Sequence, residues 1–143
     1  MALVHDMAES VVGDITPADD VPKEEKARRE AETMEYLCGN LIGACGDGTA
    51  AKGIKELFDE YEQGETLESV FVHDVDKVEL LLQMVEYERE RKGEKDLGEF
   101  TRVAKKIQLK EVKEWAKAIL KEREDFWSSV GKEAKNLDMR QHI

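Results

Sequence analysis

The chain of 143 residues begins with the stretch that decides its fold, ALVHDMAESVVGDITP at residues 2–17. Residues 2–12 contain neither proline nor glycine, which favours a helix. Their apolar members recur at helical spacing: Leu3, Val4, Met7, Ala8, Val11 and Val12. Gly13 commonly ends a helix, and Pro17 belongs in a turn. The pattern therefore predicts a helix over residues 2–12 that ends at Gly13.

His5, Asp6 and Glu9 are the chemically informative residues of this predicted helix. Glu9 follows His5 by four positions and Asp6 by three, so all three side chains are near neighbours on one surface. An imidazole nitrogen and a carboxylate oxygen can bind a divalent cation, and a second carboxylate can take a proton from water that the cation activates. The alternative is a half-exposed helix whose polar side faces water, and the His-Asp pair taken alone favours that alternative.

Two longer stretches carry a family resemblance. Residues 2–17, continued by KEEK at 23–26 and RRE at 28–30, resemble the HD-domain phosphohydrolases. Within them the similarity is to the small 5'-deoxynucleotidase subfamily, which removes phosphate from deoxyribonucleoside monophosphates. The stretch FVHDVDKVE at residues 71–79 resembles the family's later aspartate motif, and QMVEYE at 83–88 continues the match. The resemblance implies an all-α, HD-domain-like helical bundle that is shortened at its amino end.

The resemblance also implies roles for individual residues. The metal ligands would be His5, Asp6 and Asp76, with Glu9 as the general base and Asp14 as a contact of the nucleotide sugar. The cofactor would be a divalent metal ion, and Mn, Co, Mg and Fe all suit histidine and carboxylate ligands. The substrates would be deoxyribonucleoside 5'-monophosphates, and a homodimer is expected.

One ligand of the family has no counterpart in the chain. The family's first histidine lies upstream of residue 1, and neither His73 nor His142 matches its position. A second hypothesis is therefore a non-catalytic helical module that serves oligomerisation or regulation. Bound metal and phosphate release from deoxynucleotides would distinguish the two hypotheses.

The later aspartate motif offers two carboxylates. Residues 65–91 predict one long helix with Thr66 as a cap. Its main apolar stripe consists of Leu67, Val70, Phe71, Val78, Leu81, Leu82 and Val85. Asp74 falls inside this stripe and Asp76 on the opposite side, so periodicity selects Asp74 whereas the resemblance selects Asp76. We assign Asp76 as the ligand and expect Asp74 to be a solvated or capping carboxylate.

Further helices are expected along the rest of the chain. Pro22 suits an early position of a helix that runs to about residue 37. Residues 50–62 carry apolar residues at helical spacing, as do two stretches after a break at residues 93–98. Between the first two of these helices, the glycines of residues 38–49 predict a flexible connection.

Two groups of side chains could be either functional or structural. The charged face of residues 23–30 is expected to be a solvated surface with salt bridges, and the alternative is that Lys23 or Arg28 contacts a substrate phosphate. Trp115 and Trp127 are expected to pack in the fold rather than to stack on a base.

Composition limits the class of protein and its partners. Charged residues make up 38% and hydrophobic residues 41%, which suits one helical domain over residues 1–130 with a polar tail at 131–143. The net charge of -11 argues against polymeric nucleic acid, although the local charge of a bound cation permits a small phosphate ester. No apolar run approaches the roughly 20 residues that span a bilayer, so no membrane partner and a cytoplasmic or nucleocytoplasmic location are expected.

Overall fold

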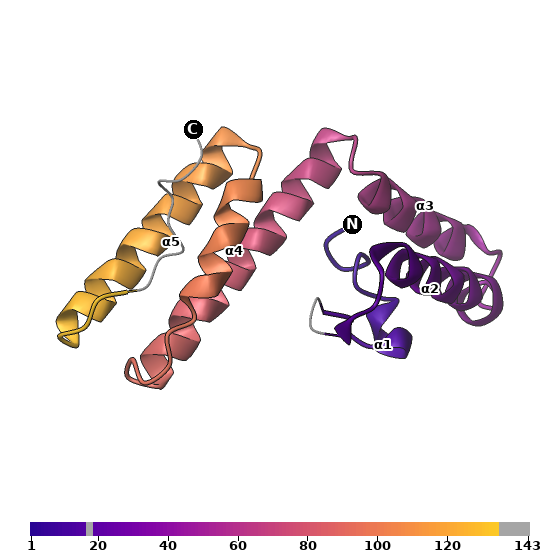
Figure 1. The fold of residues 1–143 in the computed structure, drawn as a ribbon. Helices are drawn as coiled ribbons and strands as arrows, with labels where there is room; N and C mark the ends of the chain where they lie inside the picture. The colour runs from indigo at the N-terminus through magenta and orange to yellow at the C-terminus, as the bar shows by residue number, and fades with distance from the viewer. Residues whose placement is uncertain (17–18, 135–143) are drawn as a thin grey trace. The chain divides into compact units, whose positions relative to one another are not determined.

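The computed structural model describes residues 1–16 and 19–134, and every regular element in those ranges is a helix (Figure 1). The predicted all-α fold class is confirmed. The chain divides into two compact units, the first being Met1–Ser69 and the second beginning at Val70. Most of the predicted tail at residues 131–143, including His142, lies outside the described residues. Of the helices described, none combines the length and the apolar character needed to cross a membrane.

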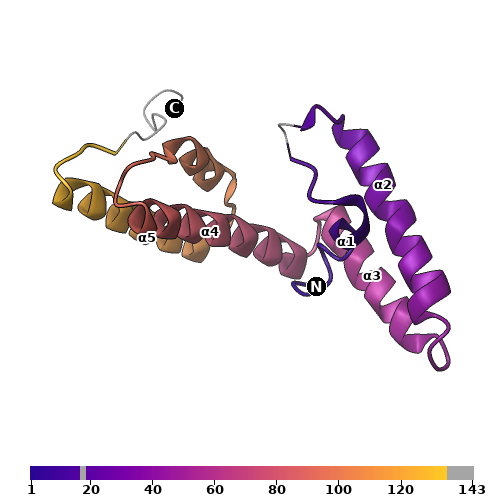
Figure 2. The ribbon, with the colours of Figure 1, turned by 90° about the horizontal axis from the view of Figure 1, so that it is seen from below.

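The first unit is built from α1 (Glu9–Val12), α2 (Lys23–Tyr36), the π-helix η2 (Leu37–Ile42) and α3 (Thr49–Gln63). The helix α3 runs back alongside α2, as both views show (Figures 1 and 2). The core of the first unit joins the amino-terminal segment to these two helices through buried apolar side chains: Val4, Ala8, Met34, Cys38, Ala51 and Phe58. This core fixes the segment that carries His5 against α2 and α3.

The amino-terminal segment is less regular than predicted. Residues 2–8 form successive turns, and only α1 is α-helical, so the predicted helix over residues 2–12 is wrong in its first two thirds. The turns use bonds between residues three apart, such as the 3.0 Å bond from the Met7 amide to the Val4 carbonyl. Side chains also engage the backbone here: the Ser10 hydroxyl donates to the Met7 carbonyl at 2.6 Å, and His5 Nδ1 lies 2.9 Å from the Ala2 carbonyl oxygen. Such bonds compete with a regular helical ladder.

The predicted flexible connection at residues 38–49 is also wrong in its first part. The π-helix η2 continues α2 directly, and turns occupy only residues 43–48. Gly43 permits this wide turn, because a Cβ there would lie 2.5 Å from the Cys38 carbonyl oxygen. Cys38 itself is buried in the core of the first unit.

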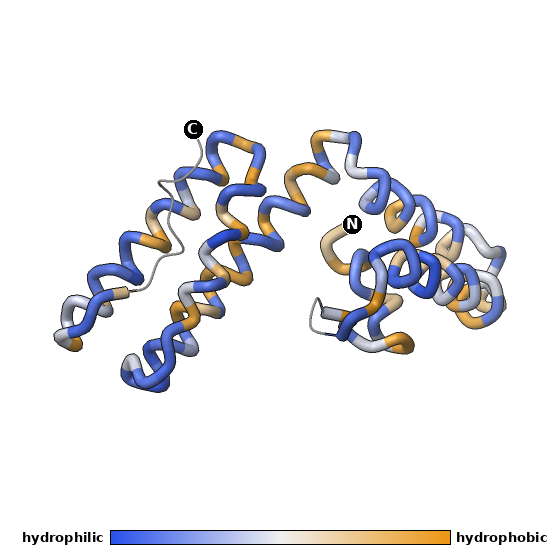
Figure 3. The backbone as a smooth tube through the Cα atoms, in the orientation of Figure 1, coloured by the Kyte–Doolittle hydropathy of each residue, from blue (hydrophilic) through white to orange (hydrophobic). Residues whose placement is uncertain are grey.

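The second unit contains most of α4 (Leu67–Glu90), together with the 3-10 helix η3 (Gly98–Lys106) and α5 (Lys110–Ser129). Hydrophilic and hydrophobic positions alternate along these helices, as expected for amphipathic elements (Figure 3). Their apolar faces meet in one core of buried side chains: Val78, Leu81, Met84, Val85, Ile107, Val112, Ala116 and Ile119. The long predicted helix is confirmed, and so is its cap, because Thr66 Oγ1 accepts a 3.1 Å bond from the Ser69 amide.

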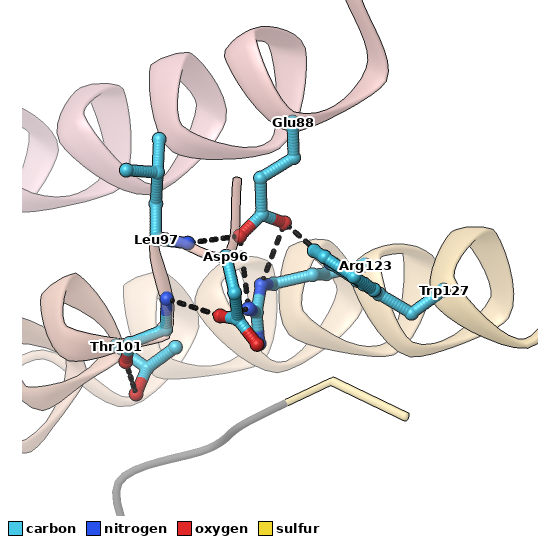
Figure 4. Close-up of polar contacts among 7 residues, drawn as sticks. Glu88, Asp96, Leu97, Thr101, Arg123 and Trp127 are labelled. Atoms are coloured by element: carbon cyan, nitrogen blue, oxygen red, sulfur yellow. Dashed lines mark hydrogen bonds and ion pairs between the residues drawn. The ribbon is translucent and has the colours of Figure 1, made fainter. Parts of the chain in front are cut away.

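A buried polar network links α4, the following loop and α5 (Figure 4). Glu88 and Arg123 are both fully buried, and the guanidinium donates two 2.9 Å bonds to the carboxylate. The Glu88 carboxylate also accepts bonds from Trp127 Nε1 and from the Leu97 amide, each 2.7 Å long. Trp127 therefore packs inside the fold as predicted, whereas Trp115 is half exposed.

Candidate functional site

His5 is held in the first unit with one ring nitrogen fixed and the other available. Only 14% of its side chain is exposed, and its ring packs against Tyr61 with centroids 4.8 Å apart. Because the Ala2 carbonyl can only accept, the 2.9 Å contact at Nδ1 favours the tautomer with the proton on Nδ1. Nε2 then carries a lone pair, as a neutral metal-binding histidine requires.

The Nε2 atom of His5 faces the carboxylate of Asp6. The distance from Nε2 to Asp6 Oδ2 is 2.9 Å, yet the two atoms do not have hydrogen-bond geometry. Nε2 is buried without a hydrogen-bond partner among the described residues. A lone pair and a carboxylate at this separation repel each other unless a cation or a proton lies between them. The pair therefore fits one nitrogen and one oxygen ligand of a divalent metal ion.

Glu9 begins α1, four residues after His5 and three after Asp6. Its side chain is one quarter exposed, and its carboxylate lies 3.5 Å from the ammonium of Lys26. Burial raises the pKa of Glu9, and the negative charges of Asp6 and Asp14 raise it further, while Lys26 opposes the shift. A carboxyl group with a raised pKa is a stronger base than an ordinary glutamate, which suits a residue that accepts a proton from water.

Asp14 lies in the turn that follows α1. Gly13 adopts a φ of 79°, a backbone conformation that favours glycine. A Cβ at this position would meet no atom within 4 Å, so glycine is not needed there for space. The side chain of Asp14 is exposed, and its charge acts on Glu9. Asp14 is thus accessible to a ligand and near enough to Glu9 for the two charges to interact.

The two aspartates of the later motif have different environments on α4. Asp74 is fully buried, and its carboxylate accepts bonds of 2.7 to 3.0 Å from the amides of Gln108 and Leu109, just before α5. Asp74 is therefore a capping carboxylate, the second of the two structural roles expected for it. Asp76 is exposed and lies in the second unit, whereas His5 and Glu9 lie in the first.

No group of three or more histidine, cysteine, aspartate or glutamate side chains in residues 1–16 and 19–134 is arranged to hold a metal ion. In the first unit His5 lies against Asp6, and the charges of Asp6 and Asp14 act on Glu9. The assignment of Asp76 as a third ligand stays a prediction.

Paired substitutions at the two aspartates test that assignment. We expect Asp76→Asn to lower the metal content of the purified protein while leaving its stability nearly unchanged, because Asp76 is exposed. We expect Asp74→Asn to keep the metal but to lose about 1–3 kcal/mol of stability, because an amide satisfies the two backbone donors poorly. Metal analysis and urea unfolding of both variants provide the measurement. Loss of metal in Asp74→Asn but not in Asp76→Asn would show that the assignment is wrong.

The charged face of α2 divides into a solvated part and a part turned toward Glu9. Arg28 is exposed and bonds to Glu25 and Glu32, so the predicted salt-bridged surface is confirmed at this residue. Lys26 and Glu30 instead lie against the candidate site, and the sequence interpretation missed them. Their spacing could have revealed them, because Lys26, Glu30 and the buried Met34 follow one another at intervals of four on one face.

Comparisons with known proteins identify a matching family model and similar proteins. A family model described as "HD domain" matches residues 1–116. The 5'-deoxynucleotidase hdd1 of Schizosaccharomyces pombe is 53% identical over 130 residues, which cover 91% of this chain and 65% of that protein. The 5'-deoxynucleotidase YGK1 of Saccharomyces cerevisiae is 45% identical over 130 residues, which cover 91% and 60%.

Structural comparison leads to a similar protein. The solved structure of an HD domain-containing protein, YGK1, matches with a TM-score of 0.69 and 40% identity. The match covers 88% of this chain and 63% of that one. The chain spans less than two thirds of the length of the relatives it matches.

Proposed function

Because this chain belongs to the HD domain family, we propose that it is a metal-dependent phosphohydrolase that removes the 5'-phosphate from deoxyribonucleoside 5'-monophosphates. The observation that carries the proposal is the buried Nε2 of His5, which faces the Asp6 carboxylate at 2.9 Å with no hydrogen-bond partner among the described residues. The names of the relatives, which are 5'-deoxynucleotidases, support the substrate class.

The proposed site gives each residue one task. His5, Asp6 and Asp76 would hold a divalent ion, for which Mn, Co, Mg and Fe are all suitable. Such an ion supplies Lewis acidity toward the phosphoryl group and toward water. Glu9 accepts a proton from the water that attacks phosphorus, the bond from phosphorus to the 5'-oxygen breaks, and that oxygen takes a proton from solvent as the nucleoside leaves. Asp14 accepts a hydrogen bond from a sugar hydroxyl.

Metal content and phosphate release test the proposal together. The purified protein should contain or bind a divalent ion and should release phosphate from dCMP and dAMP, with lower rates on AMP. A homodimer in the cytoplasm is part of the proposal, and light scattering would measure the oligomer. Metal-free protein that releases no phosphate when Mn²⁺, Co²⁺, Mg²⁺ or Fe²⁺ is added would favour a non-catalytic helical module.

The raised pKa of Glu9 predicts the pH dependence of the reaction. A base must be deprotonated to act, so kcat/KM should fall as the pH drops through the pKa of Glu9. Because burial and then Asp6 and Asp14 raise that pKa, the fall should begin at a higher pH than an ordinary glutamate would give. A profile of kcat/KM against pH, with the metal kept saturating, measures the effect. A rate that stays constant down to the ordinary range of glutamate would contradict it.

A further inference from the structure

The ammonium group of Lys26 connects three parts of the first unit. It donates a 3.1 Å hydrogen bond to the carbonyl of Ile15, in the turn after α1. It also lies 3.5 Å from a carboxylate oxygen of Glu9 on α1 and 3.5 Å from one of Glu30 on α2 itself. One side chain of α2 thus reaches both the proposed base and the turn that carries Asp14.

The surroundings of Lys26 differ from those of the other basic residues of α2. About one third of the Lys26 side chain is exposed, and Glu30 is only 13% exposed, whereas more than half of Arg28 faces solvent. Partial burial reduces the screening of an ion pair by water, so contacts of Lys26 are stronger than those of a solvated pair. Burial alone lowers the pKa of Lys26, but Glu30 and Glu9 outweigh it and raise the pKa overall. The ammonium therefore stays charged at neutral pH.

The ammonium of Lys26 contacts three groups at once rather than forming a single ion pair. An ammonium has three N–H donors, and here a carbonyl and two carboxylates surround it. Glu30, one helical turn further along α2, holds the lysine from its own helix. The position of Glu9 is thereby fixed from α2, because α1 is a single short turn without a side-chain cap.

We propose that Lys26 is a positioning residue of the candidate site, which holds the Glu9 carboxylate and the Ile15 carbonyl in place. This inference rests on the proposed function, because it gives Lys26 its role through the base Glu9. Lys26 itself need not touch the substrate. Without it, Glu9 and the turn with Asp14 would move relative to His5 and Asp6, and a small misplacement of catalytic groups can cost a large part of the rate.

Two variants and one control separate positioning from a general effect on the fold. Lys26→Met removes the charge and keeps most of the apolar chain, and Lys26→Arg keeps the charge. Lys52→Met is the control, because Lys52 is an exposed lysine of the same unit, on α3. We expect Lys26→Met to lower kcat on dCMP by about 10- to 100-fold with little change in KM. Lys26→Arg should recover most of the loss, and Lys52→Met should match the unmodified chain.

Hydrogen exchange tests whether Lys26 holds Glu9 and the turn after α1 in place, and it does so without relying on catalysis. Mass spectrometry of the peptide that covers residues 9–16 should show faster amide exchange in Lys26→Met than in the unmodified chain, Lys26→Arg or Lys52→Met. Unchanged exchange in Lys26→Met, or an unchanged kcat in an active protein, would overturn the inference. If the unmodified chain releases no phosphate in the presence of metal, the proposed function fails, whereas faster exchange in Lys26→Met would still show that Lys26 holds this segment.

Discussion

Replacing Glu9 by glutamine is expected to lower kcat on dCMP by about 10²- to 10⁴-fold, the usual loss when a general base is removed. The amide is nearly the same size as the carboxylate but cannot take a proton from water. Its oxygen can still accept a bond from Lys26, so the local structure should persist. The largest effect on activity should therefore come from a substitution that changes the fold very little.

Metal content and thermal stability must accompany the rate measurement. Glu9→Gln should retain its metal and its thermal midpoint, because Glu9 is proposed as a base and not as a ligand. The matched control is Glu24→Gln, which makes the same change at an exposed position of α2 and should leave kcat unaltered. Unchanged hydrolysis in Glu9→Gln would remove Glu9 from the mechanism, and loss of metal would make it a ligand instead.

Much of the fold follows from local sequence signals, and the helices α3 and α4 show why. Gly64 adopts a φ of 68° and its amide bonds to the Glu60 carbonyl, so α3 ends at a local signal that glycine provides. Thr66 then caps α4 through its hydroxyl. These signals act between residues close in sequence, where backbone conformation and a single hydrogen bond decide the outcome.

The incorrect predictions for residues 2–12 and 38–49 have local causes that the spacing of residue types along the chain does not reveal. The apolar spacing of residues 2–8 is helical, but the backbone forms turns in which side chains such as Ser10 bond to backbone carbonyls. The glycines of residues 38–49 suggested flexibility, yet Gly43 is needed because the chain packs closely on the Cys38 carbonyl. A glycine that permits a close approach and a glycine that permits motion look the same in a sequence.

The candidate site could be predicted only as far as its residues are neighbours in sequence. His5 contacts Asp6, its neighbour in sequence, and the Asp6 charge acts on Glu9 three residues later. The grouping of all three stays a prediction, because it assumed a helix where residues 2–8 form turns. Lys26 looked like one more charge of a solvated face, because its contact with Ile15 depends on how the turn after α1 meets α2. Asp74 lay inside an apolar stripe, and only the structure shows the backbone amides that it satisfies.

Replacing Glu88 by alanine is expected to destabilise the second unit by about 3–5 kcal/mol, the cost of breaking a buried ion pair by removing one partner. Glu88 and Arg123 are 35 positions apart, and both are completely buried. The carboxylate accepts bonds from the guanidinium, from Trp127 and from the Leu97 amide, so its removal leaves buried donors on α5 and on the loop without their acceptor (Figure 4).

Urea unfolding followed by tryptophan fluorescence measures this loss directly. Both tryptophans lie in the second unit, so their emission reports on the unit that contains the network. The matched control is Glu122→Ala, which breaks the exposed pair between Arg89 and Glu122, also formed between α4 and α5, and should cost less than about 1 kcal/mol.

A graded series of Glu88 variants tests whether the lost charge and hydrogen-bond acceptors, rather than the lost side-chain volume, destabilise the second unit. Glu88→Gln keeps one acceptor oxygen and should fall between the unmodified chain and Glu88→Ala. The double variant Glu88→Leu, Arg123→Met removes the uncompensated guanidinium charge and should recover only part of the stability. The Trp127 and Leu97 donors still lack an acceptor in that variant, and Asp96 loses its 2.7 Å ion pair with Arg123. If Glu88→Ala is as stable as Glu122→Ala, the network does not hold α4 and α5 together, and the apolar core of Leu81, Val85 and Ile119 alone must do so.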